Sequence, residues 1–346
     1  MRSEFSRRDF LKLSLSGAAA TFAGNHRAGL YDLDSDKILR VATTSVSVYS
    51  KPSDESRILY QHFRDDLVNY YYEVNSPHGP EYNPKWYRVW GGYMHSAHLQ
   101  KVKYRLNSIL PSVANGEIIA QVTVPYTQVM WNRGKLGWEP SYRYYYQSMH
   151  WISGIAEGPD GEPWYKIHDE LLDNVGFFVR PEHLRPIPLQ EFAPISPDVE
   201  PWKKRIEVSI PLQALTAYEG DEIVMQTKIS SGLPDYAAVD GEISTNTPRG
   251  DFNVYSKMPS KHMGDGNLTS DPEAYELPGV PWATFFAPHG VAFHGTYWHD
   301  NFGVPMSHGC INMKWEEAQW IFRWTLPDAF GDKIEQVGFG TRVIVT

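Results

Sequence analysis

Proline and glycine recur along the whole chain, and this punctuation limits the length of any regular element. The 346 residues include 25 prolines and 27 glycines. Between them lie short stretches in which apolar and polar residues alternate, such as VATTSVSVY and KWYRVWGGY. Alternation with a period of two is typical of half-buried strands joined by turns. The sequence therefore predicts a mainly β protein with few helices.

The charge balance excludes one large class of partners. The chain carries 32 basic and 41 acidic side chains, a formal net charge of -9, so it lacks the basic surface that nucleic-acid binding requires. Aromatic residues make up 14% of the sequence, with 12 Trp and 21 Tyr. Such side chains suit surfaces that bind polar, sugar-containing ligands.

The N-terminus begins MRSEFSRRDFLKLSLSGAAATFAG. Arg7 and Arg8, followed by Phe10 and a small-residue apolar stretch, resemble a twin-arginine export signal over residues 1–30. The resemblance implies export to the periplasm, the outer face of the cytoplasmic membrane or the cell wall. Cleavage after Ala20 or Ala23 and retention as an anchor both stay open.

Two segments share an order of residues. Trp86 and Tyr87 are followed by a turn and a closing His-Leu pair, and the same order returns at Trp164 and Tyr165, 78 residues later. Both segments, 37–105 and 112–190, resemble small bacterial SH3-like β-barrels. The second holds an aromatic insertion, WNRGKLGWEPSYRYYYQSMHW (residues 131–151), which is either a ligand surface or a loop that covers the core.

Five prolines in residues 186–201 indicate an extended spacer, so we predict a linker at 191–201 and a third domain at 202–346. Within that domain, residues 219–221 read as a turn between two strands and GTRVIVT as a last strand. Residues 315–324 have helical spacing, with Trp315, Ala318, Gln319 and Phe322 on one face. Residues 257–281 look like a long loop, either a lid over the site or a hairpin insertion.

Cys310 is the only cysteine, so no intramolecular disulfide can form, and a solitary thiol in an exported chain needs a reason. Gly309 precedes it and lets the backbone turn sharply, while His294 lies 16 residues upstream at the end of an apolar strand. A thiol with a nearby base is the pattern of a cysteine nucleophile; a buried, inert cysteine is the alternative. His289, His294, His299 and His308 are of a residue type that binds zinc, but neither HExxH nor paired cysteines occur.

The pattern HGTYW followed by FGxPxSHGCINM resembles the signature of the L,D-transpeptidase catalytic domain. TPRGDF, residues 247–252, resembles the family's Thr-Pro-x-Gly-x-Phe turn. The resemblance covers residues 202–346 and implies a β-sandwich of mixed sheets with a short helix. Asn312 stands where many members carry Arg, which bears on substrate contacts.

The resemblance also implies roles. Cys310 is expected to be the nucleophile and His294 the general base that later protonates the leaving amine. Gly295 is expected to orient the imidazole, and the amides around His308, Gly309 and Cys310 are expected to form the oxyanion site. Ser307 and Asn312 are expected to shape the pocket. Tyr297 and Trp298 either stack on the substrate or cap the sandwich, and His299 is expected at the rim. No metal or organic cofactor is implied.

The implied activity is peptidoglycan L,D-transpeptidation. Cys310 attacks the L-centre carbonyl of a tetrapeptide stem, releases D-alanine and forms a thioester that an amine acceptor resolves. The alternatives are an L,D-carboxypeptidase, with water as acceptor, and a non-catalytic wall-binding protein. Papain-like wall peptidases place Cys before His, whereas His294 precedes Cys310 here. Stem peptides are the expected partners and a carbapenem the expected covalent inhibitor, while the sequence leaves the oligomeric state open.

Overall fold

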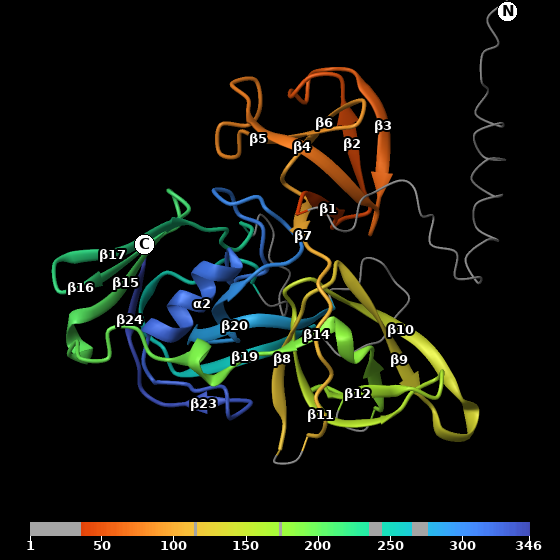
Figure 1. Ribbon diagram of the computed structural model, residues 1–346. Coiled ribbons are helices and arrows are strands. Elements are labelled where there is room, and N and C mark those ends of the chain that lie inside the picture. Colours follow the sequence, from red (N-terminus) through yellow and green to blue (C-terminus); the bar gives the residue numbers. More distant parts are fainter. Residues whose placement is uncertain (1–35, 114–115, 173–174, 235–243, 265–275) are drawn as a thin grey trace, which may run out of the picture. The chain divides into compact units, whose positions relative to one another are not determined.

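The computed structural model describes residues 36–113, 116–172, 175–234, 244–264 and 276–346 (Figure 1). These residues are mainly β, and α2 (Trp315–Trp324) is the α-helix among them. The predicted fold class is confirmed. The predicted export signal, residues 1–30, lies outside the described residues. No helix in the described ranges is long and apolar enough to cross a membrane.

The two N-terminal sheets have the same strand order. The first runs β3-β2-β6-β5-β4-β1-β7 and the second β10-β9-β13-β12-β11-β8-β14, so each strand of the first corresponds to the strand seven labels later. Trp86 and Tyr87 on β5 and Trp164 and Tyr165 on β12 therefore occupy equivalent strands, and all four are buried. The first sheet contains β1 (Ile38–Val41), β2 (Ser45–Tyr49), β3 (Ile58–Phe63), β4 (Leu67–Asn75), β5 (Lys85–Val89), β6 (Gly92–His95) and β7 (Leu99–Val102). The second contains β8 (Ile118–Val122), β9 (Tyr126–Asn132), β10 (Trp138–Tyr145), β11 (Met149–Glu157), β12 (Pro163–His168), β13 (Phe177–Val179) and β14 (Leu184–Pro186), with short 3-10 turns η1 (Gly134–Leu136) and η2 (Pro181–His183).

The aromatic segment 131–151 is not an inserted loop. It contains the end of β9, all of β10 and the start of β11, because its aromatic residues continue the strand alternation. Tyr144 lies in the core of the second sheet, whereas Met149 and Trp151 pack into the core of the C-terminal region. These three side chains are buried, so they stabilise the fold and do not form a ligand surface.

The proline-rich segment is not a free spacer. It forms η3 (Leu189–Phe192) and, after an irregular stretch, η4 (Pro201–Lys203). Phe192 is fully buried, with ring centroids 5.1 Å from Trp282 and 6.3 Å from Phe322. The backbone of Ile195 donates to the carbonyl of Arg323 at 3.1 Å. The linker prediction missed this packing because one aromatic side chain outweighs the extended bias of the neighbouring prolines.

The C-terminal region contains two mixed five-stranded sheets. One has the order β17-β16-β15-β24-β18 and the other β22-β21-β20-β19-β23, with parallel pairs β15/β24 and β21/β22. Their strands are β15 (Lys204–Ser209), β16 (Ala214–Glu219), β17 (Glu222–Lys228), β18 (Gly250–Asn253), β19 (Ser256–Met263), β20 (Leu277–Ala287), β21 (Val291–Gly295), β22 (Ile311–Met313), β23 (Gln336–Val337) and β24 (Arg342–Val345). Apolar residues from both sheets form one core. α2 packs on β20 and β21 (Figure 1), so the helix braces the strand that carries His294.

The predictions within this region hold in most places. The turn at 219–221, the last strand and the helix limits agree with the structure. On the helix, Ile321 and Trp324 are buried, whereas Gln319 is only half-buried. The segment 257–281 belongs to a hairpin, because β19 and β20 pair in antiparallel fashion, from the pair Ser256–Phe285 to the pair Met263–Leu277. Residues 265–275 at its tip lie outside the described residues.

His262 on β19 joins carboxylates from two parts of the chain. Its Nδ1 lies 2.8 Å from Asp169 Oδ2 and its Nε2 2.6 Å from Glu276 Oε2, so both nitrogens donate when the ring is protonated. Burial alone would lower the pKa of His262, but the hydrogen bonds and charges of Asp169 and Glu276 raise it overall. The other titratable groups around it are Glu170, which accepts from the His262 backbone N–H, then Lys261, His150 and Tyr142.

The raised pKa of His262 predicts a pH-dependent stability. The folded state holds this proton more tightly than the unfolded state, so the stabilisation is complete below the unfolded pKa of about 6.5. It is lost as the pH rises through the folded-state pKa. Replacing His262 by Gln should therefore lower the thermal midpoint more at about pH 5.5 than at about pH 8.5. An equal loss at both pH values, measured by circular dichroism, would contradict the charged state of His262.

Candidate active site

The two parallel strands β21 and β22 separate a core face from a reactive face. Val291, Phe293, Ile311 and Met313 belong to the main core. Side chains alternate along a strand, so Ala292, His294 and Asn312 point to the opposite face, and Cys310 packs there against Ala292. His294 is the register partner of Asn312. The local sequence thus brings the predicted nucleophile and base to one face of the sheet.

His294 is held as a neutral base. It is fully buried, and its Nδ1 lies 3.1 Å from the Gly295 carbonyl oxygen. A carbonyl can only accept, so the proton sits on Nδ1 and Nε2 keeps its lone pair. Nε2 is buried with no hydrogen-bond partner among the described residues. Burial lowers the pKa of His294 to about 4, against the opposing effect of the Gly295 hydrogen bond. The hydrogen bond from His294 Nδ1 to the Gly295 carbonyl is the contact through which Gly295 was expected to orient the imidazole.

Cys310 precedes the first residue of β22 and is half-buried. Burial raises the pKa of its thiol to about 11, while a backbone hydrogen bond from Ala292 acts in the opposite direction. The Sγ atom lies 3.7 Å from the carbonyl oxygen of Gly290, to which the S–H group donates. The resting pair is therefore a neutral thiol and a neutral imidazole on the same face of the sheet.

The loop before Cys310 is closed by its own hydrogen bonds. Ser307 Oγ donates to the Cys310 carbonyl at 2.6 Å and accepts from the Gly309 N–H at 3.2 Å. Gly309 has a φ of +116°, a conformation that side chains other than glycine rarely adopt. The Gly309 N–H thus already donates to Ser307, whereas it was expected to donate to the oxyanion. Ser307 is buried and ties the turn, whereas His308 is exposed.

Thr247, from the TPRGDF turn, supports this loop from behind. Its buried hydroxyl donates to the Gly309 carbonyl at 2.8 Å and accepts from the Gly232 N–H at 2.8 Å. The hydroxyl therefore connects the chain after β17 with the turn that carries Cys310. A Cβ on Gly232 would lie 2.0 Å from the Thr245 carbonyl oxygen, so the approach of these two segments requires glycine there.

Replacing Thr247 by Val should lower the free energy of unfolding by about 1–3 kcal/mol for each buried group left without a partner. Valine has the same shape, so the loss reports the two hydrogen bonds. Thr245→Val is the matched control, because the Thr245 hydroxyl is exposed where it donates to Leu233, and it should cost less than about 0.5 kcal/mol. Denaturant unfolding measures both. Equal losses in the two variants would contradict the supporting role.

The two aromatic residues predicted near the substrate differ in their exposure. Tyr297 is 2% exposed, and its hydroxyl donates to the Pro278 carbonyl at 2.9 Å. Of the two alternatives for Tyr297, a cap on the sandwich agrees with this burial, and the contact with substrate stays a prediction. Trp298 is half-buried with its ring centroid 5.7 Å from that of His294. It stays a candidate for substrate contact beside the base.

His299 is not a rim residue. It is 5% exposed, and its Nε2 lies 2.8 Å from the side-chain amide of Asn312. Asn312 is also buried, and one of its amide atoms has no partner among the described residues. The rim prediction failed because the polar character of His299 is satisfied by Asn312 and by the backbone of Asn301 rather than by water.

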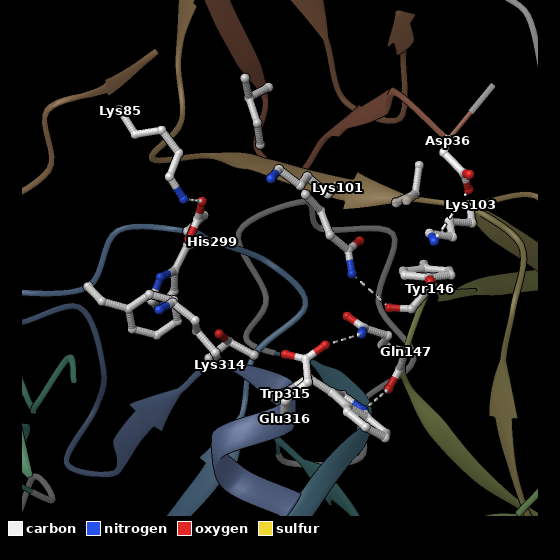
Figure 2. A pocket seen from close by; sticks show the side chains of 16 residues that line it. Asp36, Lys85, Lys101, Lys103, Tyr146, Gln147, His299, Lys314, Trp315 and Glu316 are labelled. Atoms are coloured by element: carbon white, nitrogen blue, oxygen red, sulfur yellow. Dashed lines mark hydrogen bonds and ion pairs between the residues drawn. The ribbon is translucent and has the colours of Figure 1, made fainter. Parts of the chain in front are cut away.

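A cavity of about 360 Å³ lies next to these residues without including Cys310 or His294. Figure 2 shows His299 on one side of it and Trp315 and Glu316, from the start of α2, on another. Its four lysines each lie within ion-pair distance of a carboxylate: Lys85 with Asp300, Lys101 with Glu73, Lys103 with Asp36, and Lys314 with Glu317. Since these charges are paired and the thiol is elsewhere, the reactive face of β21 and β22 is the candidate active site.

Sequence reasoning missed the supporting residues. Thr247 was recognised only as part of a turn, and the role of the Gly290 carbonyl was not predicted. A glycine four residues before His294 in a strand-to-strand turn was the one available hint for Gly290. For His299, the spacing of five residues from His294 gives no strand or helix periodicity, so its partner could not be inferred.

A family model matches the C-terminal region of the chain. Residues 203–345 match the family model described as YkuD, L,D-transpeptidase catalytic domain. The match confirms the resemblance predicted for residues 202–346 and identifies this region as the catalytic domain of a cysteine-dependent transpeptidase. It covers less than half of the 346 residues. No curated protein sequence matches the chain.

Several solved structures are similar to part of the chain. An L,D-transpeptidase from Mycobacterium smegmatis is 26% identical, with a TM-score of 0.32, over 42% of this chain and 58% of that one. An L,D-transpeptidase from Xylanimonas cellulosilytica is 27% identical, with a TM-score of 0.30, over 41% and 60%. L,D-transpeptidase 3 from Mycobacterium tuberculosis, in complex with a faropenem-derived adduct, is 21% identical, with a TM-score of 0.31, over 50% and 74%. The chain thus spans less than two thirds of the length of the first two, and the domain assignment rests on the family match.

Proposed function

We propose that this protein is an exported peptidoglycan L,D-transpeptidase with Cys310 as nucleophile and His294 as general base. The observation that carries the proposal is the unpartnered Nε2 lone pair of His294, fixed by the Gly295 carbonyl on the same sheet face as Cys310. A neutral buried imidazole with a free lone pair is suited to take a proton from a thiol of high pKa. The catalytic-domain match at residues 203–345 supports the reaction class.

The proposed reaction has two half-steps. His294 Nε2 removes the Sγ proton as Cys310 attacks the carbonyl carbon at the L-centre of a tetrapeptide stem. The tetrahedral intermediate collapses to a thioester, and the proton on His294 passes to the leaving D-alanine amine. An amine of a second stem, or of a surface protein, then attacks the thioester, His294 accepts its proton, and the thiol returns.

Reaction with a carbapenem tests the nucleophile directly. Wild-type protein should gain the mass of one opened carbapenem ring, because Cys310 Sγ adds to the lactam carbonyl and no group leaves. Cys310→Ala should gain none. Intact-protein mass spectrometry distinguishes the two, with thermal unfolding as a control that the variant is folded. An unmodified wild-type protein, or an equally modified Cys310→Ala variant, would overturn the proposed nucleophile and favour the non-catalytic alternative.

Product analysis identifies the acceptor. Purified tetrapeptide muropeptides should yield cross-linked dimers and free D-alanine if an amine resolves the thioester. Shortened tripeptide monomers without dimers would instead identify an L,D-carboxypeptidase, in which water is the acceptor. Both products depend on Cys310, so the Cys310→Ala variant is the blank for each.

We further propose that the two seven-stranded N-terminal segments are SH3-like wall-binding modules. The support is their common strand order and the equivalent Trp-Tyr pairs on β5 and β12. Binding to the wall would raise the effective concentration of the catalytic domain at its polymeric substrate. A sedimentation assay with purified peptidoglycan tests this; retention of Cys310→Ala on the wall supports it, and equal amounts of protein with and without wall material would contradict it.

Export by the twin-arginine route belongs to the same proposal and rests on Arg7 and Arg8. Replacing both by Lys keeps the charge but removes the pair that this route reads. The protein should then accumulate inside the cell, as fractionation and immunoblotting would detect. Unchanged export of the double-Lys variant would exclude this route.

A further inference from the structure

The hydrogen bonds of His299 fix which of its nitrogens carries the proton. Its Nδ1 lies 3.2 Å from the backbone nitrogen of Asn301, and a backbone N–H can only donate, so Nδ1 is the unprotonated nitrogen. Burial lowers the pKa of His299 to about 3, helped by the neighbouring His98 and His294. The ring is therefore neutral and its one proton is on Nε2.

This proton determines the orientation of Asn312. His299 Nε2 lies 2.8 Å from the Asn312 amide, at the position assigned to Nδ2. With that assignment, two donors would face each other. Exchanging the oxygen and nitrogen of an asparagine amide requires only a half-turn about the Cβ–Cγ bond, and hydrogen bonding decides which orientation is correct. The consistent assignment turns the amide, so that Asn312 Oδ1 accepts from His299 Nε2–H. The NH2 group then occupies the buried position without a partner among the described residues.

The NH2 group of Asn312 lies on the reactive face. Asn312 and His294 are register partners on parallel strands, so their side chains leave the sheet on the same side. Cys310 lies two residues before Asn312 and packs on that side against Ala292. A further donor is useful here, because the Gly309 amide, one of those expected to stabilise the oxyanion, already donates to Ser307 Oγ.

We propose that His299 is a positioning residue that holds the Asn312 amide with its NH2 group toward the reacting carbonyl, where Asn312 donates to the oxygen of the acyl substrate. The proposal deepens the proposed function and rests on it. Asn312 is the group that touches substrate, and His299 acts through it. His299 also borders the cavity of Figure 2.

Four variants of the full chain separate this arrangement from a structural role. Asn312→Asp keeps an acceptor for His299 but removes the donor, so acylation by a carbapenem should fall about 10²–10³-fold. His299→Leu frees the amide to turn and should lower kcat for the tetrapeptide donor about tenfold with little change in KM. His299→Gln offers an acceptor to Asn301 and a donor to Asn312, and should restore most of the rate. Phe302→Leu, which alters packing at a ring 5.2 Å from His299, is the control and should stay within about threefold.

Nitrogen NMR of the labelled protein gives an independent readout, since it reports the His299 tautomer whether or not the protein is active. The expected result is a proton on Nε2 and none on Nδ1, with protected Asn312 side-chain NH2 signals. The proposal would be overturned if His299 carried its proton on Nδ1. It would also be overturned if Asn312→Asp were acylated at the wild-type rate, or if His299→Leu and His299→Gln had equal rates. If wild-type protein forms no Cys310 adduct, the proposed function fails, and the tautomer still decides whether His299 orients Asn312.

Discussion

Replacing His294 by Ala is expected to lower the rate of Cys310 acylation about 10²–10⁴-fold near neutral pH. The reason is that burial raises the pKa of the Cys310 thiol to about 11, so almost no thiolate forms without a base. Burial also lowers the pKa of His294 to about 4, so the imidazole is free to accept the proton over a wide pH range. The base therefore contributes most where the thiol is neutral.

The size of this loss should depend on pH in a defined direction. Wild-type acylation should rise as His294 loses its proton above about pH 4 and then stay level until the thiol ionises. The His294→Ala variant should instead rise about tenfold per pH unit toward the thiol pKa of about 11. The two rates therefore converge in alkali. Carbapenem acylation followed by mass spectrometry from about pH 5 to about pH 10 measures both profiles.

His289→Asn is the matched control for this experiment. It removes another imidazole from the turn before β21, where His289 is exposed and has a φ of +61° that asparagine tolerates. Its profile should follow that of wild type. A constant ratio between wild type and His294→Ala at every pH would mean that His294 does not act as the base.

The reactive pair could be predicted from the sequence because strand alternation places it. His294 ends an apolar strand and Cys310 follows a glycine that reverses the chain, so a shared face required only that the two strands be neighbours. The partners of Ser307, Gly309 and His299 could not be predicted in the same way. Ser307 and His299 bond to residues close in sequence, but in irregular turns whose hydrogen-bond pattern follows no periodicity. The Gly309 carbonyl accepts from Thr247, 62 residues away.

The predicted linker also missed packing that depends on contacts between residues far apart in sequence. Local composition predicted a spacer at residues 191–201, yet Ile119, Met149, Trp151 and Phe192 lie in the same core as the C-terminal sheets. Strand patterns indicate which side chains are buried, but they do not indicate which sheet buries them. The β content and the helix were therefore predictable, whereas the continuity of this core across the predicted linker was not.

Replacing Arg40 by Met is expected to lower the free energy of unfolding by about 3–5 kcal/mol. The guanidinium on β1 is 2% exposed and donates to Asp65 Oδ1 at 3.1 Å, to Gln100 Oε1 at 2.9 Å and to the Tyr297 carbonyl at 2.8 Å. Methionine fills similar space but leaves the carboxylate and two buried oxygens without this donor. Arg143 also pairs with Asp65 at 2.5 Å, which places the expected loss at the lower end of that range.

Lys85→Met is the control, because the Lys85 pair with Asp300 is about one quarter to one third exposed, with side-chain exposures of 30% and 24%. Such a pair contributes about 0–1 kcal/mol. Urea unfolding of both variants measures the difference, and an Arg40→Met/Asp65→Asn double variant should lose less than the sum of the single losses. The Tyr297 carbonyl lies two residues before His299, so Arg40→Met should also slow acylation more than Lys85→Met does. Equal stability of the two single variants would show that the buried Arg40 contacts do not hold the first sheet to the loop that carries His299.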